Sequence, residues 1–177
     1  MADQQEIHVD THIQIHRMPS DLYLYWRNPE NMPHILDFLE EVMALDDQQS
    51  RWTVLVAGNE RITWDTEITE EIRGQLIRWH SGGNMDVLHD GLVRFSGTGK
   101  HRVTDLHLQL NFFFPLMKDS RPDMLGEDME NRVREDLQRF KQAVEANEFP
   151  KKRREGKRGL PWGFPGAAPQ KGSPFSY

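Results

Sequence analysis

Histidines recur at every fourth position near the start of the chain, at His8, His12 and His16. On a helix this spacing would put three imidazoles on one face, an arrangement typical of metal ligands. The segment alternates strictly between apolar and polar residues, however, which predicts a strand. Residues four apart on a strand are separated by roughly 13 Å, too far to share one ion. We therefore expect no metal site from these three histidines.

A smaller set of metal-ligating residues depends on how the strands pair. Asp10 lies between His8 and His12, and it would meet Asp105 and His107 if the first and last strands of the chain were neighbours. Zinc ligands need a shaped, closed geometry, and a solvated polar face is the commoner outcome for such a group. We expect a solvated face here, with no metal and no cofactor.

His89 is the one residue among the polar side chains expected to point inward that titrates near neutral pH. A general base must lie within hydrogen-bonding reach of its substrate. The sequence supplies no inward pair of carboxylates, no nucleophile elbow and no third residue to orient this histidine. Arg102 either points inward, in phase with Thr104, or ends its strand in solvent. The sequence therefore predicts no catalytic residue.

Alternating segments predict the elements that position these residues. The first is "IHVDTHIQI" (7–15), and two short helices are expected within 18–36, with cap-like starts at Ser20 and Asn28. Six further strand-like runs begin near residue 40 and end with "HRVTDLHLQLNFFF". Short turns join them, which predicts an antiparallel meander of about seven strands.

A long amphipathic helix is expected after "SRPD", because apolar residues recur there at spacings of three or four. The stripe that should face the sheet consists of Leu125, Met129, Val133, Leu137, Phe140 and Val144. The residues expected in water are Glu130, Arg134, Glu135 and Arg139. Strands followed by one packed helix predict an α+β fold.

Charge divides the chain into two parts. The whole sequence has a net charge of -6, and residues 151–177 carry seven basic residues and one glutamate, which leaves -12 for residues 1–150. Phosphate binding needs a basic face, so the acidic part is not expected to bind nucleic acid. We expect a folded domain over 1–149 and a tail over 150–177 that is too rich in Lys, Arg, Gly and Pro to form a core, and so is disordered unless bound.

The tail combines a cationic cluster with aromatic residues. Its candidate binding residues are Lys151, Lys152, Arg153, Arg154, Lys157, Arg158, Trp162 and Phe164. This composition suits an anionic membrane surface, or docking onto a large protein complex. A solubilising tail without a partner is the remaining alternative.

The chain has no cysteine, which excludes disulfides, thiolate zinc sites and a cysteine nucleophile. No stretch approaches the roughly 20 apolar residues that span a bilayer, and "MADQQEIHVD" lacks the basic start and apolar segment of a secretory signal. We expect a cytoplasmic protein, with the cytoplasmic face of a membrane as a location open to the tail.

The order of one strand, two short helices, six strands and a long helix resembles the polyketide cyclase/dehydrase-like branch of the START-like (SRPBCC, helix-grip) superfamily. The motifs that carry the resemblance are "YLYWRNPENMPHIL", "ITWDTEITEEIRGQLIRWHS", "GLVRF" and "REDLQRFKQAVE", and it covers residues 6 to about 148. It implies a curved antiparallel sheet around the C-terminal helix. Between them it implies an apolar cavity, which many members use for lipids, polyketides or isoprenoid quinones.

Strand alternation then selects the residues that would line this cavity. Trp64, Thr66, Ile68 and Ile72 share one face, as do Ile77, Trp79 and Ser81. The candidate ligand-binding residues are Trp26, Trp64, Thr66, Ile68, Trp79, Ser81, His89, Phe95, Leu108, Phe112, Met129 and Val133. The alternative is that these side chains only fill a core.

Three functions follow from this resemblance and composition. The first is non-catalytic binding or carriage of a hydrophobic small molecule, such as a lipid, an isoprenoid or a polyketide-like compound. The second is a structural or assembly subunit of a larger, membrane-associated complex, docked through the tail. The third is an enzyme of the polyketide cyclase or dehydratase type. A cavity of roughly 300 Å³ or more would favour the first function, and a sealed core the second.

Overall fold

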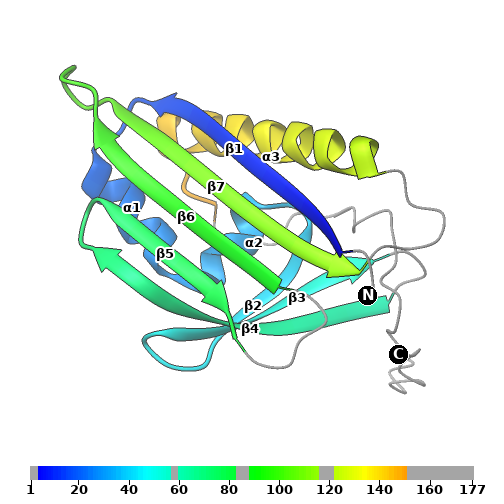
Figure 1. Ribbon diagram of the computed structural model, residues 1–177. Coiled ribbons are helices and arrows are strands. Elements are labelled where there is room, and N and C mark those ends of the chain that lie inside the picture. Colours follow the sequence, from blue (N-terminus) through cyan, green and yellow to red (C-terminus); the bar gives the residue numbers. More distant parts are fainter. Residues whose placement is uncertain (1–3, 57–59, 83–87, 116–121, 151–177) are drawn as a thin grey trace, which may run out of the picture.

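The computed structural model describes residues 4–56, 60–82, 88–115 and 122–150. A curved antiparallel sheet forms one layer, and the helices lie against its concave side and along one edge (Figure 1). This is the α+β helix-grip fold that the sequence predicts.

Seven strands and three helices with a short 3-10 turn make up the described part of the chain. The strands are β1 (Gln4–Ile15), β2 (Leu39–Ala44), β3 (Gln49–Val56), β4 (Glu60–Ile72), β5 (Leu76–Ser81), β6 (Leu88–Gly97) and β7 (Thr104–Pro115). The helical elements are α1 (Pro19–Arg27), η1 (Pro29–Asn31), α2 (Met32–Ile35) and α3 (Pro122–Glu145). Asn28 caps η1 by accepting a hydrogen bond from the Glu30 backbone N–H at 3.2 Å. The expected cap at Ser20 is wrong, because α1 begins at Pro19 and its N-cap is Met18.

The strand order is β1-β7-β6-β5-β4-β3-β2, so each strand from β2 onward pairs with its neighbour in the chain. The exception is β1, which pairs with β7, the last strand. Their register sets Ile7 opposite Phe112 and His12 opposite His107. The first and last strands are therefore neighbours. This pairing is what allows Asp10 to approach Asp105 and His107.

A bulge in β4 reverses the faces of its second half. The register between β4 and β5 shifts between Ile68 and Glu70, so that one extra residue is inserted. Because side chains alternate with a period of two, an odd insertion moves each following side chain to the other face. Ile72 is 45% exposed, and the prediction that it shares the inner face with Trp64 is wrong. Glu71 instead lies opposite the buried Ile77.

Helix α3 runs along β1 and covers one side of the core (Figure 1). The predicted stripe is buried at Met129, Val133, Leu137, Phe140 and Val144, whereas the side chain of Leu125 lies outside the described residues.

Arg139, one of the residues expected in water on α3, contacts a buried carboxylate. Arg139 is half-buried and donates to the buried Asp136 carboxylate at 2.7 Å. Burial raises the pKa of Asp136, while the backbone N–H of Asp37 and the Arg139 guanidinium oppose this shift. These contacts tie α3 to the segment that precedes β2.

Candidate functional site

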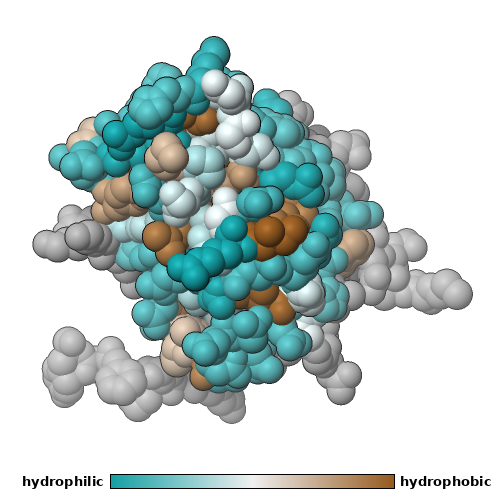
Figure 2. Space-filling model, turned by 90° about the vertical axis from the view of Figure 1, so that its left-hand side faces the viewer, coloured by the Kyte–Doolittle hydropathy of each residue, from teal (hydrophilic) through white to brown (hydrophobic). Residues whose placement is uncertain are grey.

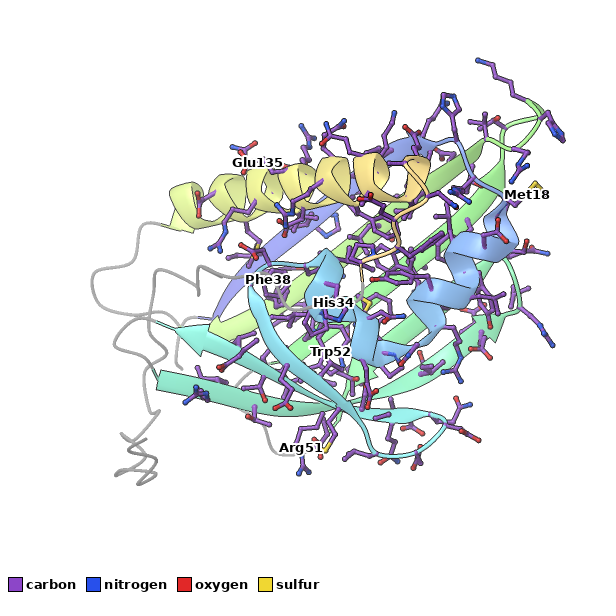
Figure 3. All side chains as sticks on the ribbon, turned by 180° about the vertical axis from the view of Figure 1, so that it is seen from behind. Met18, His34, Phe38, Arg51, Trp52 and Glu135 are labelled. Carbon is purple, nitrogen blue, oxygen red and sulfur yellow. The ribbon has the colours of Figure 1, made fainter. Side chains whose placement is uncertain are left out.

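Three tryptophans meet on the concave face of the sheet. The Trp52 ring on β3 lies 5.9 Å from that of Trp79 and 6.3 Å from that of Trp64, measured between ring centroids. All three are at most 5% exposed. Figure 3 shows Trp52 between the sheet and the short helices, whereas the neighbouring Arg51 points away from them. Trp64 and Trp79 thus both point inward, into a cluster of rings.

His89 lies within this cluster and is fully buried. Its ring stacks on Phe112 with centroids 4.5 Å apart and lies edge-on to Trp52 at 5.2 Å. Its backbone N–H donates to Ser81 Oγ at 2.6 Å. Burial, with a smaller contribution from His80, lowers the pKa of His89 to about 3. The imidazole is therefore uncharged at neutral pH and offers one N–H and one acceptor nitrogen.

Several buried polar atoms in the cluster and in nearby Trp26 lack a hydrogen-bond partner among the described residues. They are the indole nitrogens of Trp26, Trp64 and Trp79 and both ring nitrogens of His89. Buried polar groups in native proteins are nearly always paired, and an unpaired one costs about 1–3 kcal/mol. By contrast, the Trp52 indole N–H donates to Ser50 Oγ at 2.9 Å. The cluster therefore holds unused donors inside an apolar environment.

Gly91 allows the Trp79 ring to lie across β6, where the two residues are paired. A Cβ built on Gly91 would stand 2.1 Å from two carbon atoms of the Trp79 ring. Any other residue at this position would push the indole away. The first residue of the "GLVRF" motif is thus explained by the close approach of an aromatic ring to the strand.

A cavity of about 40 Å³ adjoins the ring cluster. Its apolar wall comes from Trp26, Met32, Trp52, Ile77 and Trp79, and Ser50 and Thr66 add hydroxyl groups that hydrogen-bond each other at 2.9 Å. This volume holds about one water molecule, well below the roughly 300 Å³ of a ligand pocket. The space is therefore closed to a lipid-sized molecule in this conformation.

The cavity lies under α1 and the start of α2, between these helices and strands β3 to β5. The resemblance implies a cavity between the sheet and the C-terminal helix, but no described residue of α3 lines this one. The apolar stripe of α3 packs into the core instead.

Polar residues surround the outer end of the cavity, in the hairpin between β2 and β3. Arg27 at the end of α1 crosses this end: its Nη2 donates to the Asp47 carbonyl at 2.7 Å, and it forms an ion pair with Glu71 on β4. The side of the molecule seen in Figure 2 is mainly hydrophilic, with small separate apolar patches. Arg27 thus links three elements around the access to the cavity.

The predicted ligand-binding residues fall into three groups. Trp26, Thr66, Ile68 and Trp79 line the cavity. The ring cluster behind it contains Trp64, Ser81, His89 and Phe112, and Phe95 meets the edge of Trp26 at 6.2 Å. The remaining three, Leu108, Met129 and Val133, are buried in the core and do not line the cavity. The tail residues Lys151, Lys152, Arg153, Arg154, Lys157, Arg158, Trp162 and Phe164 lie outside the described residues.

Sequence reasoning missed Trp52, the centre of the ring cluster. The signal was present, because Ser50, Trp52 and Val54 alternate with more exposed residues and are all buried. Arg27 and Met32 were also missed, and no periodicity reveals how a short helix approaches a sheet. Arg102 is exposed in the turn before β7, so the solvent-facing alternative holds for it.

No helix of the described residues has the combination of length and apolar character needed to cross a bilayer.

Known structures with the same fold come from several bacteria. A crystal structure from Deinococcus radiodurans is 27% identical with a TM-score of 0.67, over 79% of this chain and 98% of that one. A structure from Thermus thermophilus is 18% identical with a TM-score of 0.64, over 79% and 98%. The Zhui aromatase/cyclase from a Streptomyces species is 18% identical with a TM-score of 0.52, over 80% and 90%.

A search of curated protein sequences found no significant match. The family model described as polyketide cyclase / dehydrase and lipid transport matches residues 6–145. This match covers both the ring cluster and the cavity, together with all of α3. The family and the fold suggest a hydrophobic ligand-binding or polyketide cyclase-like protein. The chain belongs to the polyketide cyclase/dehydrase and lipid transport family.

Proposed function

We propose that this protein binds a hydrophobic small molecule that carries an oxygen acceptor, such as a lipid, an isoprenoid or a polyketide-like compound, in the space beneath α1. The observation that carries the proposal is the set of unpaired donors at Trp26, Trp64 and Trp79 beside the unpaired ring nitrogens of His89. A ligand site is typically an apolar enclosure with a few convergent polar groups. A carbonyl or hydroxyl oxygen among these rings would accept the hydrogen bonds that the protein leaves unmade.

Binding requires the cavity to widen, because about 40 Å³ is too small for such a molecule. The contacts that hold its outer end closed are those of Arg27 with Asp47 and Glu71. The Arg27–Glu71 pair is only partly buried, and ion pairs near the surface contribute little to stability. Breaking these contacts of Arg27 would therefore cost little free energy.

The uncharged state of His89 favours binding of the molecule without catalysis. A general base works best when its pKa lies near the working pH, and that of His89 is lowered to about 3. Neither ring nitrogen of His89 is oriented by a carboxylate among the described residues. The imidazole is suited to donate a hydrogen bond to a bound molecule, or to accept one from it, rather than to remove a proton from it.

The role of the unpaired donors can be tested with fluorenone and fluorene, which have nearly the same shape and differ by a carbonyl oxygen. We expect fluorenone to quench the tryptophan fluorescence saturably and to bind more tightly than fluorene. Replacing Trp79 by Phe removes an unpaired donor but keeps a ring. This variant should lose about 1 kcal/mol, roughly fivefold in affinity, for fluorenone and less for fluorene.

Trp52→Phe is the matched control, because the Trp52 indole N–H already has a partner in Ser50. It should change the affinity for both compounds by the same factor. If neither compound binds, and a panel of fatty acids, isoprenoid quinones and aromatic polyketides also fails to bind, the protein is not a carrier. Equal selectivity in Trp79→Phe and Trp52→Phe would contradict the role of the free donor.

The small cavity favours a second candidate function, in which the domain is a structural subunit of a membrane-associated complex docked through its basic tail.

Truncation after Pro150 tests this candidate. Pro150 itself is kept, because its carbonyl accepts a hydrogen bond from the Tyr25 hydroxyl. We expect the truncated protein to keep its thermal stability and to move from the membrane to the soluble fraction, as judged by cell fractionation. Trp162→Ala in the complete chain should release it partially. Identical partitioning of truncated and complete protein would exclude the tether.

A further inference from the structure

The outer face of the sheet, opposite the ring cluster, brings two histidines and two aspartates together on β1 and β7. His12 and His107 are directly opposite in the register, and their rings stack with centroids 3.9 Å apart and planes 8° apart. Asp10 lies two residues before His12 on the same face of β1, and its Oδ1 is 2.6 Å from His107 Nε2. The two imidazoles and this carboxylate therefore lie next to one another on the outer face of β1 and β7.

The distances are close to those of a metal site. Each of Asp10, His12 and His107 offers a ligand atom, and these atoms all lie within 4.8 Å of one another. Zinc binds imidazole nitrogen and carboxylate oxygen at about 2.0–2.2 Å in a tetrahedral arrangement, so its ligand atoms stand roughly 3.4 Å apart. Rotations of the exposed Asp10 and His12 side chains and of the partly buried His107 can bring the atoms to that separation without moving the backbone, because the strand register already sets the Cα positions.

Neighbouring residues hold two of these ligands in position. His12 Nδ1 is 3.0 Å from Asp105 Oδ2, which leaves Nε2 of that ring for a metal. Metal-binding histidines commonly use the second nitrogen to contact a carboxylate in this way, which fixes the ring and raises its basicity. The Gln109 side chain donates to Asp10 Oδ2 at 2.9 Å.

We propose that Asp10, His12 and His107 bind a divalent transition-metal ion such as Zn²⁺, with Asp105 orienting His12 and water as the fourth ligand. Imidazole nitrogens select zinc, nickel or copper over magnesium and calcium, which prefer sites made only of oxygen. The exposed Arg94 lies opposite His107 on β6 and adds one positive charge, which the two carboxylates offset. The sequence favoured a solvated face here even if the first and last strands paired. The observed distances between the three ligand atoms are the reason to propose a metal site instead.

The metal would cross-link the first strand of the sheet to the last. Because β1 and β7 are distant in sequence, a ligand that binds only the folded chain stabilises their pairing. The site is on the opposite face of the sheet from the cavity. The metal proposal therefore does not depend on the proposed ligand binding.

Calorimetric titration of the untagged full chain with Zn²⁺ tests the proposal, and thermal unfolding with and without Zn²⁺ gives a second measurement. We expect one saturable site per chain and a raised melting temperature. His12→Ala and His107→Ala should each weaken Zn²⁺ binding at least about 100-fold, and Asp105→Asn about 10- to 100-fold. Binding should weaken from pH 7.5 to pH 5.5, since the ligands must lose their protons.

His80→Ala is the matched control, because His80 pairs with Asp90 across β5 and β6 on the same outer face but has no second histidine in its pair. It should leave Zn²⁺ affinity unchanged. The proposal is overturned if no saturable Zn²⁺ binding is found, or if His80→Ala weakens binding as much as His12→Ala does. Equally strong binding of Mg²⁺ would also contradict it.

Discussion

Replacing Leu137 by alanine is expected to lower the free energy of unfolding by about 2–5 kcal/mol, because the substitution leaves a cavity in a packed core. Leu137 lies in the middle of the buried stripe of α3 and is 1% exposed. The cost combines the lost transfer free energy of the side chain with the poor collapse of the space that it leaves. Urea unfolding followed by circular dichroism measures the change.

Glu135→Ala is the control on the same helix, because Glu135 is exposed and points away from the sheet (Figure 3). It should change the free energy of unfolding by less than about 0.5 kcal/mol. Arg139→Ala should lie between the two, since it leaves the buried Asp136 without its guanidinium partner. Equal effects of Leu137→Ala and Glu135→Ala would mean that the buried face of α3 has been assigned in the wrong phase.

Alternation predicted the faces of the strands wherever pairing was regular. It set Trp64, Trp79 and His89 on the inner side, and all three are buried there. It failed at Ile72, because the bulge after Ile68 inserts one residue that no local pattern announces. A bulge depends on how two strands adapt to each other, which is a tertiary property.

The position of the cavity was harder to predict than the fold. The family resemblance implied that α3 forms one wall of the cavity, yet the apolar stripe of α3 fills the core and the cavity lies under α1. Which helix leaves a gap depends on side-chain packing between elements, and periodicity reports only which face is buried. The Asp10, His12 and His107 group shows the same limit, since its distances follow from the pairing of β1 with β7.

Acidification should destabilise this protein through His89, whose imidazole is fully buried. The pKa of His89 is lowered to about 3 in the folded state, against about 6.5 in the unfolded chain. Above pH 6.5 the imidazole is neutral in both states and its contribution to stability is fully present. Between pH 6.5 and pH 3 only the unfolded chain takes up the proton, so the free energy of unfolding falls by about 1.4 kcal/mol per pH unit.

Urea unfolding at pH 7.0 and pH 4.5 isolates this contribution when wild type is compared with His89→Phe and His89→Gln. Carboxylates titrate similarly in all three proteins, so they cancel in the comparison. The loss of stability between the two pH values should be smaller in both variants than in wild type, by about 2.5 kcal/mol. His89→Phe keeps a ring to stack on Phe112 and removes two unpaired nitrogens, so it should be at least as stable as wild type at pH 7.0. If wild type and both His89 variants lose stability in parallel, His89 is protonated in the folded state and its nitrogens have partners after all.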